Sequence, residues 1–107
     1  DTFDCVSPAR VGRNGAIYTL EGRSNITNAK YKTDFSPLVE GCDCYTCQHY
    51  TKAYLHHLFR AGELLGLTLA TIHNEQFIVT LVDEIRNSIQ DQSFEEYKKQ
   101  WLHRFYA

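Results

Sequence analysis

Three cysteines lie within six consecutive positions of this chain, Cys42, Cys44 and Cys47, in the pattern C-x-C-x2-C. Thiolates are soft ligands that suit zinc and iron–sulfur clusters. A structural zinc site usually has four ligands in a tetrahedron, commonly three cysteines and one histidine. The close spacing lets one turn of chain surround a single ion and leaves little room for disulfides among the three thiols. The pattern therefore favours zinc over an iron–sulfur cluster or redox-active thiols.

A histidine is the expected fourth ligand, and the candidates are His49, His56, His57 and His73. His49 follows Cys47 so closely that it would form a tight chelate. His56 and His57 are neighbours on a predicted helix, so their side chains diverge by about 100° and only one of them could serve. His73 stands just before a predicted helix, after a turn that could return the chain to the cysteines. Spacing favours His73 and leaves the others open.

The composition predicts one modest globular domain. The chain has 107 residues, of which 43% are hydrophobic and 22% charged, with a net charge of −2. It has no overall basic field, so contact with nucleic acid would need a local patch. It has no methionine, no signal-peptide pattern and no apolar run long enough to span a membrane. We therefore expect a piece of a longer polypeptide, cytoplasmic and with no membrane partner.

The elements that must position the cysteines are strands first and helices later. Strands are predicted over residues 2–6, 16–20 and 25–31, with a loop over 7–15 and a turn over 21–24 that makes the last two strands a hairpin.

Helices are predicted over residues 50–65 and 74–90. Ser93 and Glu96 resemble a capping box that opens a last helix. One stripe of that helix carries Phe94, Tyr97, Trp101 and Phe105. This order predicts an α+β fold, or the tail of something larger.

Several segments occur in an order and spacing that resemble the C-terminal part of bacterial tRNA-guanine transglycosylases: "FDCVSPARVGRNG", "NAKY", "CDCYTC", "AYLHHLFRAGELLG" and "TIHN". The similarity covers nearly the whole chain. It implies exchange of guanine at the anticodon wobble position of certain tRNAs for a 7-deazaguanine. In bacteria the incoming base is 7-aminomethyl-7-deazaguanine, a queuosine precursor. The implied fold is a (β/α)8 TIM barrel with a zinc-binding subdomain near its C-terminal end.

The resemblance also divides the chain by role. Residues 1–40 would carry the last barrel strands and an RNA-contacting loop, 41–75 the zinc-binding subdomain, and 76–107 the C-terminal helices. The implied ligands of one zinc ion are Cys42, Cys44, Cys47 and His73. Such an ion is structural, because protein ligands fill all four positions and leave none for water or substrate.

Base exchange on one face of the ribose is most simply reached by two inversions, which need a carboxylate nucleophile and a covalent ribosyl intermediate. The resemblance places that nucleophile on Asp4, at the C-terminal end of a barrel strand, where barrel enzymes keep their catalytic groups. The next residue, Cys5, is expected to be a small buried residue.

Residues 9–13 correspond to the family segment that recognises the anticodon around the wobble base; they are Ala9, Arg10, Val11, Gly12 and Arg13. Both arginines suit phosphates and base edges, and Gly12 would let the backbone approach RNA closely. The family usually has threonine where this chain has Ala9.

One face of the predicted helix over 50–65 carries Tyr50, Tyr54, His57 and Leu58. Such a stripe is either intramolecular core or a binding surface. The family forms homodimers through the zinc subdomain, so the resemblance makes a dimer contact the rival of the core interpretation.

The resemblance places a second catalytic acid and most of the base pocket upstream of Asp1, so the isolated chain is expected to be inactive. The alternative function is a non-catalytic, zinc-stabilised RNA-binding module or partner subunit of a transglycosylase. Asp4 together with Arg10 and Arg13 favours the catalytic interpretation.

Overall fold

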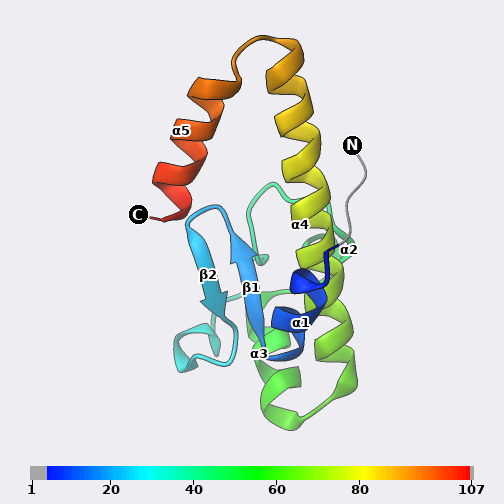
Figure 1. Cartoon of the computed structure of the whole chain (residues 1–107). Coiled ribbons are helices and arrows are strands. Elements are labelled where there is room, and N and C mark those ends of the chain that lie inside the picture. The colour runs from blue at the N-terminus through cyan, green and yellow to red at the C-terminus, as the bar shows by residue number, and fades with distance from the viewer. Residues whose placement is uncertain (1–4, 107) are drawn as a thin grey trace.

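The computed structural model describes residues 5–106 and is organised around one long helix, α4 (Leu64–Gln90), as Figure 1 shows. The elements before it are α1 (Ser7–Arg13), β1 (Ala16–Thr19), β2 (Gly22–Asn25), the 3-10 helix η1 (Ala29–Tyr31), α2 (Tyr45–His49) and α3 (Lys52–Ala61). The last helix is α5 (Phe94–Phe105). The helices α1, α2 and α3 and the strand β1 all contact α4. The predicted α+β class is confirmed.

The predicted hairpin is present, with its second strand shifted. β1 and β2 pair antiparallel, and Thr19 lies opposite Gly22, so the turn is at residues 20–21 rather than 21–24. The second strand ends at Asn25, where it was predicted to begin. The side-chain Oδ1 atom of Asn25 accepts hydrogen bonds from the backbone N–H and the hydroxyl of Thr27. Because asparagine closes turns in this way, the strand stops there.

The prediction of a loop over residues 7–15 is wrong, since Ser7–Arg13 form α1. Pro8 lies in the first turn of α1, where a helix tolerates proline. Gly12 faces α4, and a Cβ atom there would lie 3.2 Å from the Thr71 hydroxyl oxygen, so this glycine serves a close helix contact. Gly15, with φ of +82°, follows the end of the helix.

The strand predicted over residues 2–6 lies partly outside the described residues, and Asp4 lies wholly outside them. Cys5 is exposed and lies outside both strands of the described sheet. The prediction that Cys5 is buried is therefore wrong for the described part of the chain.

Two glycines explain why the helix boundaries differ from prediction. α3 is shorter than the predicted 50–65 because Gly62 adopts a left-handed φ of +73° and ends it. α4 begins at Leu64 rather than at residue 74 and includes Gly66. A Cβ atom on Gly66 would lie 3.1 Å from Leu58 Cβ, so this glycine lets α3 and α4 cross closely. His73 consequently lies within a helix, and its predicted place before one is wrong.

α5 begins at Phe94 as predicted and packs back along α4 (Figure 1). The Tyr97 hydroxyl donates a hydrogen bond to a Glu84 carboxylate oxygen of α4 at 2.5 Å. Burial, and then this hydrogen bond, raises the pKa of Tyr97. The prediction of a capping box is wrong. The Ser93 side chain makes no hydrogen bond to the first turn of α5, and its hydroxyl instead donates to the Ser88 carbonyl at 3.5 Å.

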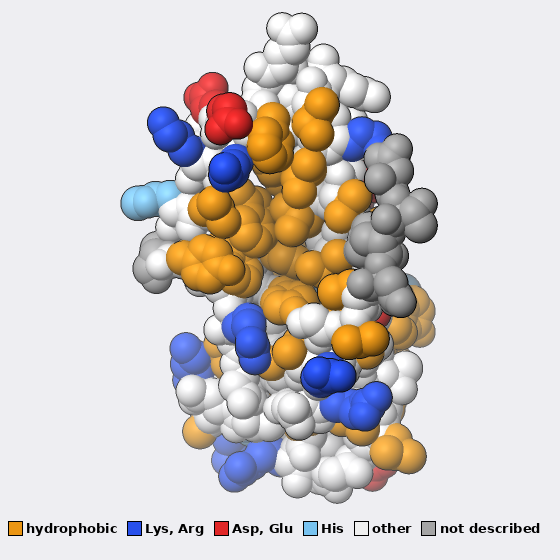
Figure 2. Space-filling model, in the orientation of Figure 1, with side chains coloured by type: hydrophobic (Ala, Val, Ile, Leu, Met, Phe, Trp, Pro, Cys, Tyr) orange, Lys and Arg blue, Asp and Glu red, His pale blue; other side chains and the backbone are white. Residues whose placement is uncertain are grey.

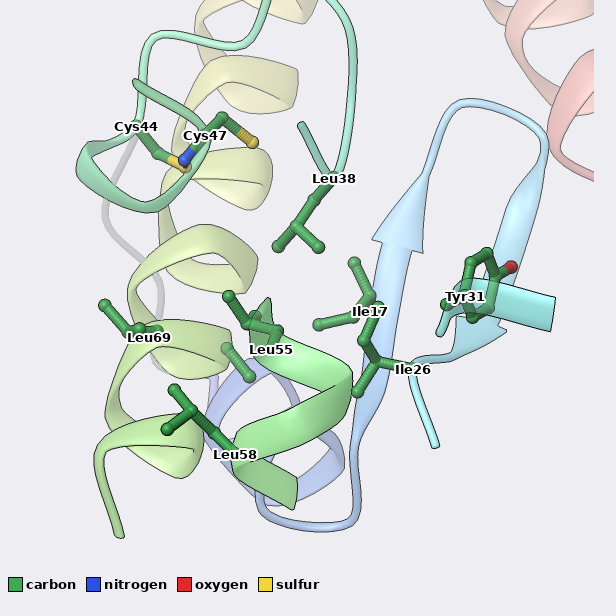
Figure 3. Packing of buried hydrophobic residues seen from close by; sticks show 10 residues of the cluster. Ile17, Ile26, Tyr31, Leu38, Cys44, Cys47, Leu55, Leu58 and Leu69 are labelled. Carbon is green, nitrogen blue, oxygen red and sulfur yellow. The ribbon is translucent and has the colours of Figure 1, made fainter. Parts of the chain in front are cut away.

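Side chains from β1, α3, α4 and the intervening segments form one buried cluster, shown in Figure 3. Ile17 and Leu55 face each other across its centre, and Leu69 approaches from α4. Cys44 and Cys47 belong to the same cluster. The cysteines are therefore a continuation of the hydrophobic core.

Leu55→Ala should lower the free energy of unfolding by about 2–5 kcal/mol, because Leu55 is 0% exposed and its removal leaves a cavity. Leu64→Ala is the matched control, since Leu64 is 76% exposed; it should change stability by less than about 0.5 kcal/mol. Urea denaturation of both variants measures the difference. Equal midpoints would contradict the assignment of Leu55 to the core.

Candidate metal centre

Four side chains converge where the loop after Gly41 meets the middle of α4. One ligand atom from each of Cys42, Cys44, Cys47 and His73 lies within 4.8 Å of the others. His73 Nδ1 is 3.8 Å from the Cys42 sulfur and 3.4 Å from those of Cys44 and Cys47. A tetrahedral zinc ion with Zn–S of about 2.3 Å and Zn–N of about 2.0 Å separates nitrogen from sulfur by about 3.5 Å. The arrangement therefore fits one such ion.

The short helix α2 explains the spacing of the last two cysteines. Cys44 is the N-cap of α2, and its sulfur accepts a hydrogen bond from the backbone N–H of Cys47 at 3.3 Å. The buried Thr46 hydroxyl donates to the Leu69 carbonyl of α4 at 2.7 Å. This bond docks α2 one helical turn before His73. The cap and the docking bond together hold both sulfurs toward the imidazole.

The His73 ring is fully buried and held at both nitrogens. Nε2 lies 2.8 Å from the Tyr18 carbonyl oxygen of β1, and since a carbonyl can only accept, Nε2 carries the hydrogen. Nδ1 then presents its lone pair to the three sulfurs. A partner behind the ring that fixes the tautomer is typical of metal-binding histidines.

The pKa values of the three thiols are shifted in opposite directions, and this pattern fits a site for a cation. A hydrogen bond from Cys47, with a smaller contribution from His73, lowers the pKa of Cys44 to about 4 despite burial. The same hydrogen bond, followed by burial, raises the pKa of Cys47, and burial raises that of Cys42. A bound metal ion replaces such thiol protons.

The remaining candidate histidines lie elsewhere. His49 is exposed and its ring lies 4.5 Å from that of Tyr45. His56 is buried, but its Nδ1 pairs with the Ile26 carbonyl at 2.9 Å. His57 is exposed. Among the described residues only His73 joins the three cysteines in a metal-binding group.

The predicted RNA-contacting residues occupy two faces of α1. Arg10 and Arg13 are exposed, whereas Gly12 is buried against α4 and Ala9 and Val11 are half-buried. Gly12 therefore lies on the face of α1 that contacts α4, rather than on the face with the exposed arginine side chains. The geometry leaves the two arginines as the groups that could reach a phosphate or a base edge.

The predicted stripe contains one core residue, whereas its other members lie at or near the surface; it consists of Tyr50, Tyr54, His57 and Leu58. Leu58 is 5% exposed and belongs to the core, whereas Tyr54 is 41% exposed and His57 is also exposed. Tyr50 follows α2 in an extended conformation and stacks on Tyr54 with ring centroids 5.4 Å apart. Tyr45 adds a further ring 6.0 Å from Tyr50, which was missed because α2 was not predicted.

The fold and the cluster define a small α+β domain whose core contains a three-cysteine, one-histidine centre suited to a metal ion. The profile of the family described as queuine tRNA-ribosyltransferase matches residues 1–107, and the chain belongs to this family.

Relatives that carry the name queuine tRNA-ribosyltransferase are similar over nearly the whole chain. The protein of Dictyoglomus turgidum is 54% identical over 102 residues, which are 95% of this chain and 26% of the relative. Those of Streptococcus equi subsp. zooepidemicus and Bacillus subtilis are 49% and 45% identical over 105 residues, 98% of this chain and 28% of each relative. The chain thus spans little more than a quarter of these relatives.

Purified chain should contain one zinc ion, and His73→Ala should lose it or bind it far more weakly, because three thiolates alone leave the tetrahedron incomplete. His49→Ala is the matched control, since His49 is exposed and stands outside the cluster. Elemental mass spectrometry after dialysis measures the metal. Full zinc content in His73→Ala, or iron in place of zinc, would contradict the expected ligand set.

Proposed function

We propose that this chain is the C-terminal part of a tRNA-guanine transglycosylase that exchanges guanine at the anticodon wobble position for a 7-deazaguanine. Family membership over residues 1–107 carries the proposal, and the cysteine–histidine cluster supports it. The incoming base is 7-aminomethyl-7-deazaguanine if the chain follows the bacterial pattern of its motifs.

The proposed chemistry is double displacement at the anomeric carbon of the wobble ribose. The Asp4 carboxylate attacks that carbon, guanine leaves and takes up a proton, and a ribosyl ester forms. The incoming 7-deazaguanine loses a proton, attacks the same carbon from the vacated face and releases Asp4. Two inversions give net retention. The proton donor and most of the base pocket belong to the part of the family sequence that precedes this match, so the isolated chain is proposed to be inactive.

Cys42, Cys44, Cys47 and His73 would hold one zinc ion. A zinc ion bound there joins the loop after Gly41 to α4 and supplies no open position for substrate. Its role is structural: it holds together the elements that support α1. The functional division at residues 40 and 75 remains a proposal about roles, since α4 runs continuously from the second part into the third.

The proposed RNA partner is the tRNA anticodon loop. Arg10 and Arg13 project from the exposed side of α1, and Figure 2 shows further Lys and Arg side chains over the half of the molecule that contains α1 and the hairpin. These charges suit phosphates of an unstacked loop. A cytoplasmic location follows from the tRNA substrate. Among residues 5–106, no helix has both the length and the apolar character to cross a bilayer.

Packing against a barrel is supported by an apolar surface. Figure 2 shows hydrophobic side chains gathered between α4 and α5. There they surround a cavity of about 170 Å³ whose apolar lining is Leu20, Val39, Phe77, Leu81 and Trp101. A surface of this kind is uncommon on a domain that stands alone. We propose that the (β/α)8 part of the enzyme covers it.

A chimera tests the catalytic role of Asp4. In the Bacillus subtilis relative, the matching C-terminal part is replaced by this chain, and exchange of labelled guanine into tRNA is measured. The chimera should be active, and Asp4→Asn should lower its activity by at least about a thousandfold, because the amide cannot form the ribosyl ester. Asp1→Asn is the control and should retain activity.

The rival function, a non-catalytic RNA-binding partner subunit, predicts a different result. The chimera would then bind tRNA without exchanging the base, and Asp4→Asn would change nothing. Exchange by the isolated 107-residue chain would contradict the proposed need for the rest of the enzyme.

Homodimer formation is proposed to use an aromatic surface in which Tyr45, Tyr54 and His57 are exposed and the half-buried Tyr50 stacks on Tyr54. Tyr54→Ala removes a stacked ring and should shift the solution mass from dimer to monomer at micromolar concentration, because central aromatic side chains dominate interface energies. Tyr106→Ala is the control, since Tyr106 is exposed just after the end of α5 and belongs to a different part of the fold. Light scattering measures the mass, and an unchanged mass for Tyr54→Ala would contradict the interface.

A further inference from the structure

Asn74 is a buried polar residue beside the metal centre that belongs to no ligand set. Its side chain is 0% exposed and all its hydrogen-bonding groups are used. Oδ1 accepts from the Tyr18 backbone N–H at 3.0 Å, and Nδ2 donates to the carbonyls of Ala16 at 2.9 Å and Pro8 at 3.2 Å. The partners determine the amide orientation, because the N–H only donates and the carbonyls only accept.

Consecutive residues of α4 hold both backbone groups of Tyr18. His73 Nε2 donates to the Tyr18 carbonyl at 2.8 Å, and Asn74 accepts from the Tyr18 N–H. This is the edge of β1 that faces away from β2, so the two side chains pair backbone groups that the hairpin leaves free. The imidazole of His73, the proposed metal ligand, and the amide of Asn74 are thus both positioned by the backbone of Tyr18.

The same amide determines where α1 lies. Nδ2 binds the carbonyl of Pro8 in the first turn of α1. One turn later, a Cβ atom on Gly12 would lie 3.3 Å from that Nδ2 atom. Pro8 and Gly12 are buried against α4, while Arg10 and Arg13 are exposed. The placement of both arginines relative to α4 therefore depends on the contact between Asn74 and the buried face of α1.

We propose that Asn74 is a positioning residue that couples the metal centre to the arginine-bearing helix α1. It contacts neither the metal nor RNA, and acts through Tyr18 on His73 and through Pro8 on Arg10 and Arg13. Only a side-chain amide satisfies all three partners. Aspartate presents no donor to the two carbonyls, and leucine leaves two carbonyls and one N–H buried without partners. The RNA side of this coupling rests on the function proposed above.

The test compares Asn74→Asp with the matched control Asn87→Asp, which makes the same change at an exposed position of α4. In the zinc-loaded 107-residue chain, a chelator should remove zinc about tenfold faster from Asn74→Asp than from wild type, as expected when the partner behind a ligand is disturbed. Asn87→Asp should match wild type. Equal rates for the two variants would overturn the metal side of the proposal.

A double-mutant cycle with Arg10→Ala tests the RNA side, in the chimera with the Bacillus subtilis relative described above and with an anticodon stem-loop RNA at low salt. Arg10→Ala should weaken binding about tenfold in the wild-type background and less than about twofold beside Asn74→Asp, because the arginine is already misplaced. A general loss of stability would leave the two effects independent. Equal effects of Arg10→Ala in both backgrounds would overturn the coupling.

Gly12→Ala provides a second variant that disturbs the contact from the α1 side, should Asn74→Asp not fold. A Cβ atom there meets Thr71 and Asn74 within 3.3 Å. We expect Gly12→Ala to retain zinc and to reduce the loss of RNA binding that Arg10→Ala causes. If Arg10→Ala weakens RNA binding as much beside Gly12→Ala as in the wild-type background, the proposal is overturned. If the chimera that carries the wild-type chain does not bind the stem-loop at all, the proposed function fails on its own account, while the chelator experiment still decides whether Asn74 supports the metal centre.

Discussion

The two nitrogens of the His73 ring hold the domain together. One faces the sulfurs of Cys42, Cys44 and Cys47, and the other binds the Tyr18 carbonyl of β1. Loop, hairpin and long helix therefore meet at one imidazole that is fully buried. If the ring turns, the backbone carbonyl loses its partner and the sulfurs lose their fourth neighbour together. A buried polar network of this kind is stable only when every member is satisfied.

The hydrophobic core continues this arrangement. Cys44 and Cys47 lie in the same cluster as Ile17, Leu55 and Leu69. The candidate metal centre is therefore one end of a continuous packed interior. The hydrogen bond from Thr46 to the Leu69 carbonyl connects that end to α4. The aromatic surface begins at Tyr45 of the same short helix α2 and continues onto α3, so a partner there would contact the element that carries Cys47.

Sequence reasoning found the three cysteines of the candidate centre because their spacing reflects the chemistry of one ion, whereas the family resemblance was needed to select His73 among the candidate histidines. It misplaced the elements around them, because glycine and proline have more than one use. Gly12 falls in the predicted loop over 7–15 and Gly66 falls just after the predicted helix over 50–65, whereas both lie inside helices where another helix approaches closely. Pro8 falls in the same predicted loop, whereas it lies in the first turn of α1. The local sequence around each glycine contains no trace of the distant helix that requires it, so α1 and residues 66–73 of α4 were not predicted to be helical.

The four side chains of the candidate centre are unevenly separated along the chain. The three cysteines are near neighbours, so a loop still unfolded elsewhere can gather them at small entropic cost. His73 lies 26 residues beyond Cys47, and it reaches them only when α3 has folded back along α4. Bringing such distant groups together carries a larger loop-closure cost. His73 would therefore complete the coordination of an ion bound there only where α3 and α4 lie together, and an ion held by all four side chains would report that this helical hairpin has closed.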